Sequence, residues 1–187
     1  MRSCCCILVV AALLGCATEE PGINPPRDGF YFPTGVALDP VRPILYVTNS
    51  NADLMYNGAT LTALDLRRLP ADLSRVGSAV KAGSLVCSAS RTDTTVWECD
   101  ASQFVQRGAT IRMGDFPGGI EVSSDGSRLF VPVRGQNYLL WADVKDLGAG
   151  QIDIRCATDS DPSCNDAGTS NCEVWDCDSS HRVDYSE

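Results

Sequence analysis

Alternation of apolar and polar residues with a period of two is the dominant pattern of this chain. In the segment 128–134 the odd-numbered positions are Leu or Val, and the even-numbered ones include two arginines. Such alternation is typical of β-strands that bury one face. Further strands are expected at 60–66 (TLTALDL) and 138–144 (YLLWADV), each preceded by turn-forming residues. The pattern predicts an all-β protein with antiparallel strands.

An internal repeat relates two parts of the chain at an offset of 84 residues (116 − 32 = 84). The stretch 32–38 (FPTGVAL) matches 116–122 (FPGGIEV), and without a gap 45–47 (LYV) then matches 129–131 (LFV). Turn-forming residues separate the two anchors in both copies. Each copy is therefore predicted to form a β-hairpin.

The string F-P-x-G-V-A-L-D-P, followed by LYVTN at 45–49 and TLTALDL at 60–66, resembles the YVTN and NHL classes of β-propeller repeat. The resemblance covers 30–66 and 116–144. It implies antiparallel four-stranded blades around a central channel, and about one and a half to two blades here, where closed propellers have four or more. We therefore expect a fragment of a longer protein. Association of several chains, an open sheet and an unrelated sandwich with two similar hairpins are the alternatives.

The length of the repeat indicates an insertion within the first blade. A blade takes about 40–50 residues, and no second pair of F-P-x-G and LYV anchors occurs within the spacing of 84. We place the insertion at 67–108 and expect 109–113 (ATIRM) to be the strand that returns to the sheet. A second insertion is expected at 155–182, and both belong to a domain spanning 30–187.

The N-terminus carries an export signal. A short positive region precedes the uncharged apolar stretch 4–14, which is too short to span a membrane. The residues LLGC at 13–16 resemble the lipobox of bacterial lipoproteins. This resemblance implies a signal peptide at 1–15, acylation of Cys16 and a lipid-anchored tether at 16–29. An ordinary secretory signal is the alternative.

Charge limits the partners of the chain. It has 24 acidic and 15 basic side chains, for a formal net charge of −9. Nucleic acid and anionic lipid surfaces require clustered Lys and Arg, so neither is expected as a partner. We expect the acyl chains of Cys16 alone to hold the protein on the bilayer, and Ala17 favours the outer membrane in the enterobacterial form of the family. A protein or glycan is the expected further partner.

Cysteines of the exported domain are expected to form disulfides, because the compartment is oxidising. Cys87 and Cys99 flank the turn-like stretch 91–95 (RTDTT), which predicts a hairpin closed by a Cys87–Cys99 bond. The remaining four are Cys156, Cys164, Cys172 and Cys177. They allow three connectivities, of which nested pairing, 156–177 with 164–172, is favoured.

Few residues suggest catalysis or metal binding. The Cys-rich segment 156–181 has no C-x2-C zinc knuckle and no D-x-[DN]-x-[DN]-G calcium loop, so neither a metal nor a cofactor is expected. The single histidine, His181, lies beside Ser180 and Asp178, but neighbours in sequence do not make the geometry of a catalytic triad. No catalytic residue is assigned.

Aromatic residues divide into two groups. One group is expected to pack in the core or between blades and comprises Phe30, Tyr31, Phe32 and Trp141. Trp97 and Trp175 lie in the two Cys-rich insertions and are the candidate binding residues, with packing around the disulfides as the alternative.

Three functions compete on these grounds. The leading hypothesis is a membrane-anchored, propeller-type lipoprotein that serves as a binding or scaffold module, with the two insertions as its contact surface. The first alternative is a propeller enzyme of lactonase-like or quinoprotein-like type, whose site would lie partly in missing blades. The second alternative is a purely structural envelope protein.

Overall fold

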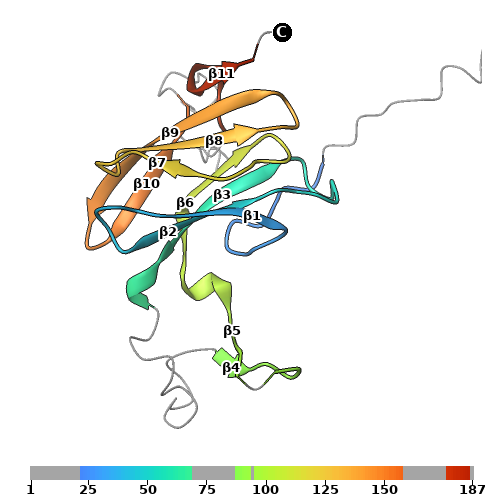
Figure 1. Cartoon of the computed structure of the whole chain (residues 1–187), viewed down its shortest axis with the longest axis vertical. Coiled ribbons are helices and arrows are strands. Elements are labelled where there is room, and N and C mark those ends of the chain that lie inside the picture. The colour runs from blue at the N-terminus through green and yellow to red at the C-terminus, as the bar shows by residue number, and fades with distance from the viewer. Residues whose placement is uncertain (1–21, 69–86, 94, 158–175, 186–187) are drawn as a thin grey trace, which may run out of the picture.

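The computed structural model describes residues 22–68, 87–93, 95–157 and 176–185. Within these ranges the chain forms two antiparallel β-sheets that lie against one another, and a small hairpin apart from both (Figure 1). The helices found there are 3-10 turns of three residues, and none has the length or apolar character of a transmembrane helix. The prediction of an all-β fold with antiparallel strands is confirmed.

The first sheet follows the chain in its strand order. Its strands are β1 (Pro33–Leu38), β2 (Ile44–Asn49), β3 (Ala59–Asp65) and β6 (Val105–Met113). β3 and β6 confirm the strands predicted at 60–66 and 109–113. β6 begins four residues before the predicted start, because Val105 already pairs with Leu64 across a β-bulge.

A long excursion separates β3 from β6, as predicted from the repeat length. It begins with η1 (Leu66–Arg68) and contains β4 (Cys87–Ala89), β5 (Trp97–Cys99) and η3 (Ala101–Gln103). Cys87 lies directly opposite Cys99 in the β4–β5 ladder, and Cys99 is disulfide-bonded. The side chain of Cys87 lies outside the described part, so the Cys87–Cys99 bond stays a prediction that this register supports.

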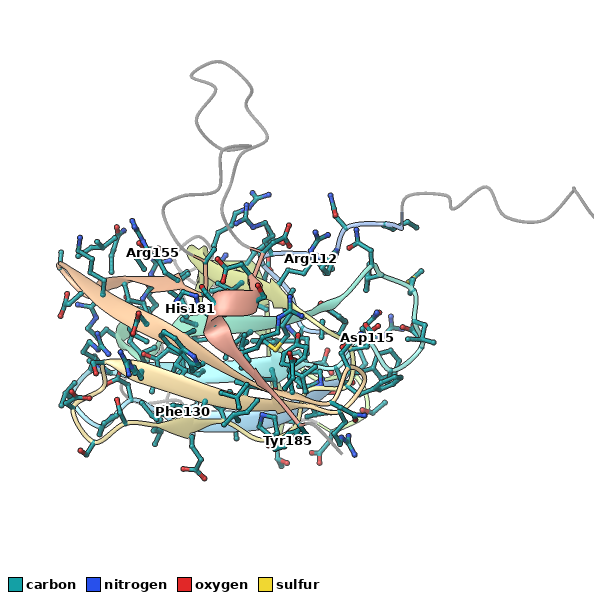
Figure 2. The ribbon with its side chains drawn as sticks, turned by 90° about the horizontal axis from the view of Figure 1, so that it is seen from above. Arg112, Asp115, Phe130, Arg155, His181 and Tyr185 are labelled. Atoms are coloured by element: carbon teal, nitrogen blue, oxygen red, sulfur yellow. A yellow bond between two sulfur atoms is a disulfide. The ribbon has the colours of Figure 1, made fainter. Side chains whose placement is uncertain are left out.

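The second sheet is centred on a long strand. Its strands are β7 (Glu121–Val122), β8 (Arg128–Val133), β9 (Tyr138–Gly148), β10 (Gln151–Arg155) and β11 (Arg182–Asp184). The strand predicted at 138–144 extends to Gly148, because β10 pairs with its C-terminal half. β11 pairs with its N-terminal half. The C-terminal segment, which includes η5 (Ser179–His181), runs along this sheet from His181 to Tyr185 (Figure 2).

The two predicted hairpins pair in the same register. In β1–β2, Leu38 lies opposite Leu45, and in β7–β8, Val122 lies opposite Leu129. Each residue of the second pair follows its counterpart by 84 positions. Both hairpins are therefore confirmed, together with the equivalence of their residues.

Backbone details at the start of each copy are also repeated. The N–H of Ser50 donates to the carbonyl of Phe32, and the N–H of Arg134 donates to the carbonyl of Phe116. Phe32 and Phe116 share a left-handed backbone conformation, with φ of 47° and 57°. Because non-glycine residues rarely adopt this conformation, its recurrence indicates that both copies use the same turn to enter the sheet.

The hydrophobic core lies between the two sheets. Tyr46 and Leu61 from the first sheet and Val131 and Leu140 from the second are at most 1% exposed and belong to one cluster. In β8 the alternation predicted from sequence is observed, since the Leu and Val positions are buried and the intervening ones are exposed or partly buried. The described sheets do not close into a ring.

The segment before β1 lies on the other side of the first sheet. The carbonyl of Ile23 accepts the N–H of Asn57, and the carbonyl of Arg27 accepts the hydroxyl of Thr110 at 3.0 Å. The described part of the expected tether, residues 22–29, is thus in contact with the sheet.

Two of the aromatic predictions are wrong. Phe30 and Phe32 are 41% and 51% exposed, because the segment that carries them lies outside the layer between the sheets. Trp141 is partly buried, and its ring lies 4.2 Å from that of His181, measured between centroids.

Candidate functional site

A surface cleft of about 450 Å³ opens where β6 ends and where β9 and β11 begin. Arg112 comes from β6, Tyr138 is the first residue of β9, and Arg182 is the first residue of β11. The complete lining is Asn57, Arg112, Met113, Gly114, Gln136, Tyr138, Asp176, Cys177 and Arg182. Most of these side chains are polar, and the loops joining the strands supply the two amides.

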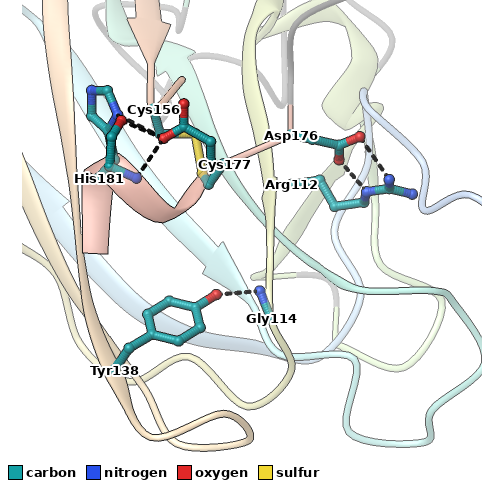
Figure 3. The surroundings of a disulfide bond; sticks show 9 residues. Arg112, Gly114, Tyr138, Cys156, Asp176, Cys177 and His181 are labelled. Atoms are coloured by element: carbon teal, nitrogen blue, oxygen red, sulfur yellow. Dashed lines mark hydrogen bonds and ion pairs between the residues drawn. A yellow bond between two sulfur atoms is a disulfide. The ribbon is translucent and has the colours of Figure 1, made fainter. Parts of the chain in front are cut away.

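A disulfide bond positions one wall of the cleft. Cys156, which directly follows β10, is bonded to Cys177 (Figure 3). The backbone continues this contact, since the N–H of Cys177 donates to the carbonyl of Arg112 and the N–H of Asp178 donates to that of Cys156. The outer bond of the predicted nested pairing is confirmed, whereas Cys164 and Cys172 lie outside the described residues.

An ion pair at the same wall fixes Arg112. Its Nε and Nη2 donate to the two carboxylate oxygens of Asp176, the second at 2.7 Å, and its Nη1 donates to Asn24 at 3.0 Å (Figure 3). Two parallel hydrogen bonds between a guanidinium and a carboxylate restrict both groups geometrically. Arg112 therefore holds Asp176, and with it the entry to the C-terminal segment.

Tyr138 and Arg182 form the opposite part of the cleft. The hydroxyl of Tyr138 accepts the N–H of Gly114 at 2.8 Å. Burial raises the pKa of Tyr138 above its ordinary value, and this outweighs the lowering effects of that hydrogen bond and of Arg182. The phenol is therefore neutral at pH 7 and keeps a proton to donate.

The guanidinium of Arg182 is the cation best placed to meet a ligand. Its Cζ lies 5.2 Å from the centre of the Tyr138 ring, which is favourable for a cation over an aromatic face. Among the described residues, no carboxylate forms an ion pair with it. Two arginines and one aspartate line the cleft, so its local charge is positive on a chain whose net charge is −9.

The Ser180, His181 and Asp178 side chains do meet, but not as a catalytic triad. Ser180 Oγ lies 2.9 Å and Asp178 Oδ1 lies 3.2 Å from the same ring atom, His181 Nδ1. A triad requires the serine at one ring nitrogen and the carboxylate at the other. Asp178 instead caps η5 by accepting the N–H of Ser180, which explains why these residues gather.

Cys16, Trp175 and the side chain of Trp97 lie outside the described part of the chain. Across residues 22–68, 87–93, 95–157 and 176–185, no group of three His, Cys, Asp or Glu side chains is placed to hold a metal ion.

The cleft residues escaped the sequence analysis for a clear reason. Arg112, Tyr138 and Arg182 belong to three different strands, and no sequence motif connects them. The sequence feature that came nearest to indicating the cleft was Cys177, five residues before Arg182. A disulfide at Cys177 ties the surrounding residues to a distant part of the chain.

Comparison with known proteins gives no family assignment. No family model matches the chain, and no significant match is found among curated proteins or solved structures.

Proposed function

We propose that this chain is an exported, lipid-anchored module of β-propeller type in the bacterial cell envelope, and that it binds an anionic glycan in the cleft beside the Cys156–Cys177 bond. The observation that carries the binding function is the guanidinium of Arg182, which lines an open polar cleft without a carboxylate partner among the described residues.

The propeller assignment is supported by the repeat. Two antiparallel sheets arise from equivalent segments, with the same register and the same entry turn, and they stack on one another. Each sheet contains a meander of adjacent strands, as propeller blades do. The resemblance of 30–66 and 116–144 to YVTN and NHL repeats points to the same architecture.

Export is supported by the disulfide chemistry and by the lipobox-like N-terminus. A Cys156–Cys177 bond is expected to persist only in an oxidising compartment such as the bacterial envelope. Acylation of Cys16 would place the domain beside the polymers of the envelope, many of which carry carboxylates.

The cleft favours a glycan with carboxylate groups on chemical grounds. Guanidinium groups form strong, charge-assisted hydrogen bonds with carboxylates. The amides of Asn57 and Gln136 and the hydroxyl of Tyr138 can bond to sugar hydroxyls. The surrounding negative charge of the protein disfavours a purely electrostatic, non-specific attachment, so the contact depends on these groups.

Binding of a defined acidic oligosaccharide tests this proposal. We expect calorimetric titration of the mature chain with oligogalacturonate to show binding, and an uncharged cello-oligosaccharide to show none. Arg182→Gln should weaken binding about tenfold, which corresponds to about 1.4 kcal/mol. Its unfolding temperature should stay close to that of the wild type, because Arg182 makes no ion pair within the described residues.

Arg107→Gln is the matched control, because it removes the same charge from an exposed position on β6 outside the cleft. It should leave the affinity unchanged. Equal weakening by both variants would show that only net charge matters, and absence of oligogalacturonate binding by the wild type would overturn the assignment of the cleft.

A further inference from the structure

The two sheets are stacked head to tail, so that equivalent faces point in the same direction. Tyr46 of the first sheet points toward the second sheet, into the common core. Its equivalent, Phe130, lies 84 residues later on β8 and faces away from the core, between the buried residues Leu129 and Val131 (Figure 2). The interface therefore joins two different faces of the same repeat unit.

The equivalence extends across the neighbouring strands. Leu61 of β3 points into the core, whereas Leu139 of β9, its counterpart in the ladder, lies on the outer face with Phe130. Conversely, Leu129 points into the core, whereas its counterpart Leu45 faces outward from the first sheet. Because of this stacking, the outer face of the first sheet and the outer face of the second sheet each lack a partner sheet within the described residues.

Both unpartnered faces expose apolar side chains. On the outer face of the first sheet, Val36 and Leu38 are 65% and 64% exposed, beside the partly buried Leu45. On the outer face of the second sheet, Phe130 and Leu139 are partly buried and the neighbouring Pro132 is exposed. The exposed Glu121, which is paired with Phe130, and Arg128 flank these apolar side chains on the same face. Adjacent exposed apolar residues of this kind are typical of interaction sites.

Within the described residues, the chain covers part of each outer face. Residues 22–31 lie over β3 and β6, where Tyr31 bonds to Thr60 and the Arg27 carbonyl to Thr110. On the second sheet, His181 packs on Trp141 of β9. On the first sheet the exposed part is β1, with Val36 and Leu38, whereas Val47 of β2 is only 4% exposed. On the second sheet the exposed part is β7–β8, and the β1–β2 and β7–β8 hairpins are equivalent in the repeat.

The equivalent glycines Gly35 and Gly119 would each allow another sheet to approach the backbone closely. A Cβ on Gly35 would lie 2.6 Å from the Gly118 carbonyl and 2.9 Å from Gly119 Cα, so the next sheet passes very close to it. Gly119 is the counterpart of Gly35 in the second copy, and a Cβ there would meet nothing within 4 Å. The space beside Gly119 is where a following sheet would approach.

We infer that the outer face of the second sheet, at β7–β8, binds the outer face of the first sheet, at β1–β2, of a second copy of this chain. The contact between the two sheets within one chain is the template. In the proposed contact between chains, Phe130 of one copy takes the position of Tyr46. Leu38 and Leu45 of the next copy take the positions of Val122 and Leu129. Contacts between two different faces of one molecule add copies head to tail, and they give rings or open filaments according to the rotation between copies. This association is independent of the proposed anchor and cleft.

Measurement of mass against concentration tests the inference. We expect sedimentation of the mature chain to show masses rising above the monomer between about 1 µM and about 300 µM. The association should strengthen with salt, because each copy carries a net negative charge and Glu121 adds a negative charge beside Phe130 in the contact. Leu38→Asp on one face and Phe130→Asp on the other should each prevent growth of long species. Pro132→Asp, at an exposed position beside Phe130, serves as the second variant if Phe130→Asp fails to fold.

Mixing the two single variants distinguishes head-to-tail contact from other modes. Each variant keeps one intact face, so an equimolar mixture of Leu38→Asp and Phe130→Asp should form a one-to-one dimer and nothing larger. Val96→Asp, at an exposed position near the β4–β5 hairpin, should associate as the wild type does. A wild type that stays monomeric would overturn the inference, as would a mixture that forms no dimer or a Leu38→Asp variant that dimerises alone.

Discussion

Asp39, the carboxylate of the first hairpin, accepts several hydrogen bonds. It accepts the backbone N–H groups of Val41 and Arg42, both at 2.9 Å, the Nε of Arg42 at 2.8 Å and the hydroxyl of Tyr46 at 2.6 Å. Arg42 in turn donates to the carbonyl of Gly126, in the turn of the second copy. Burial of Asp39 raises its pKa, but the hydrogen bonds from Arg42, Tyr46 and Val41 outweigh this, so the pKa lies below its ordinary value.

Replacement of Asp39 by Asn should change the response of the protein to acid. A carboxylate with a depressed pKa contributes stability that is complete above its unfolded pKa of about 4 and is lost as the pH falls through the folded pKa. The free energy of unfolding of the wild type should therefore fall below about pH 4, and part of this dependence should be absent in Asp39→Asn. At pH 7 the variant should lose about 3 kcal/mol, because Arg42 keeps a charge that is almost buried. Urea denaturation at a series of pH values measures both effects.

Asp53→Asn is the control for this experiment, because Asp53 lies in an exposed loop and, within the described residues, bonds only to the nearby Met55 N–H. It should change the stability at pH 7 by less than about 0.5 kcal/mol and keep the acid response of the wild type. Parallel acid curves for wild type and Asp39→Asn would contradict the role assigned to Asp39.

Among the strands, β1 and β2 of the first sheet are joined by direct hydrogen bonds to the segment that precedes β7 of the second sheet. The hydroxyl of Thr34 donates to the Pro117 carbonyl at 2.9 Å, and the hydroxyl of Thr48 donates to the Gly118 carbonyl at 3.0 Å. These bonds require β1 to approach the segment before β7 closely. A glycine at position 35 makes that approach possible, because it has no Cβ.

Gly35→Ala and Gly119→Ala form a matched pair that tests this close approach. The Cβ introduced by Gly35→Ala would clash with the backbone of Gly118 and Gly119 in the same chain. Overpacking of this kind costs about 1–3 kcal/mol. Gly119→Ala meets open space and should change stability by no more than about 0.5 kcal/mol. Urea denaturation of both variants gives the comparison, and equal stability of the two would show that the contact at Gly35 is more compliant than its geometry indicates.

For the molecule as a whole, the proposed lipid anchor at Cys16 would place the domain, its cleft and its proposed self-association at the membrane surface. In the proposed mature form, Cys16 lies six residues before Gly22, where the described structure begins, and residues 22–31 already lie against the first sheet. The domain is therefore expected close to the bilayer surface rather than on a long free tether.

Labelling with an alkyne fatty acid in a bacterial host tests acylation of Cys16. We expect the wild type to be labelled and to sediment with membranes, because several acyl chains on one residue give stable anchoring. Cys16→Ser should lose the label, whereas Cys6→Ser, a change within the expected signal peptide, should keep it. Label retained in Cys16→Ser, or absent from the wild type, would contradict the lipoprotein assignment.

The fold was more predictable than the candidate site. Strand alternation and the repeat located β1, β2, β3, β8 and the return strand β6 within a few residues, because these features depend on neighbours along the chain. The strands β10 and β11 were not predicted, since their place depends on pairing with opposite halves of β9. The exposure of Phe30 and Phe32 was also missed, because apolar character alone does not show which layer covers a side chain.

Among the three possible connectivities of the last four cysteines, the structure established the Cys156–Cys177 bond, which spacing had only favoured. The all-β class and the repeat at an offset of 84 residues, in contrast, could be inferred from the amino-acid sequence alone. These properties follow from local periodicity, turn chemistry and spacing, which the chain carries regardless of its final shape. The head-to-tail stacking of the two sheets, and the meeting of Arg112, Tyr138 and Arg182 in one cleft, became visible only in the folded molecule. Both results require segments far apart in sequence to pack together, and the free energy that selects such packing comes from surfaces that exist only after the strands have formed.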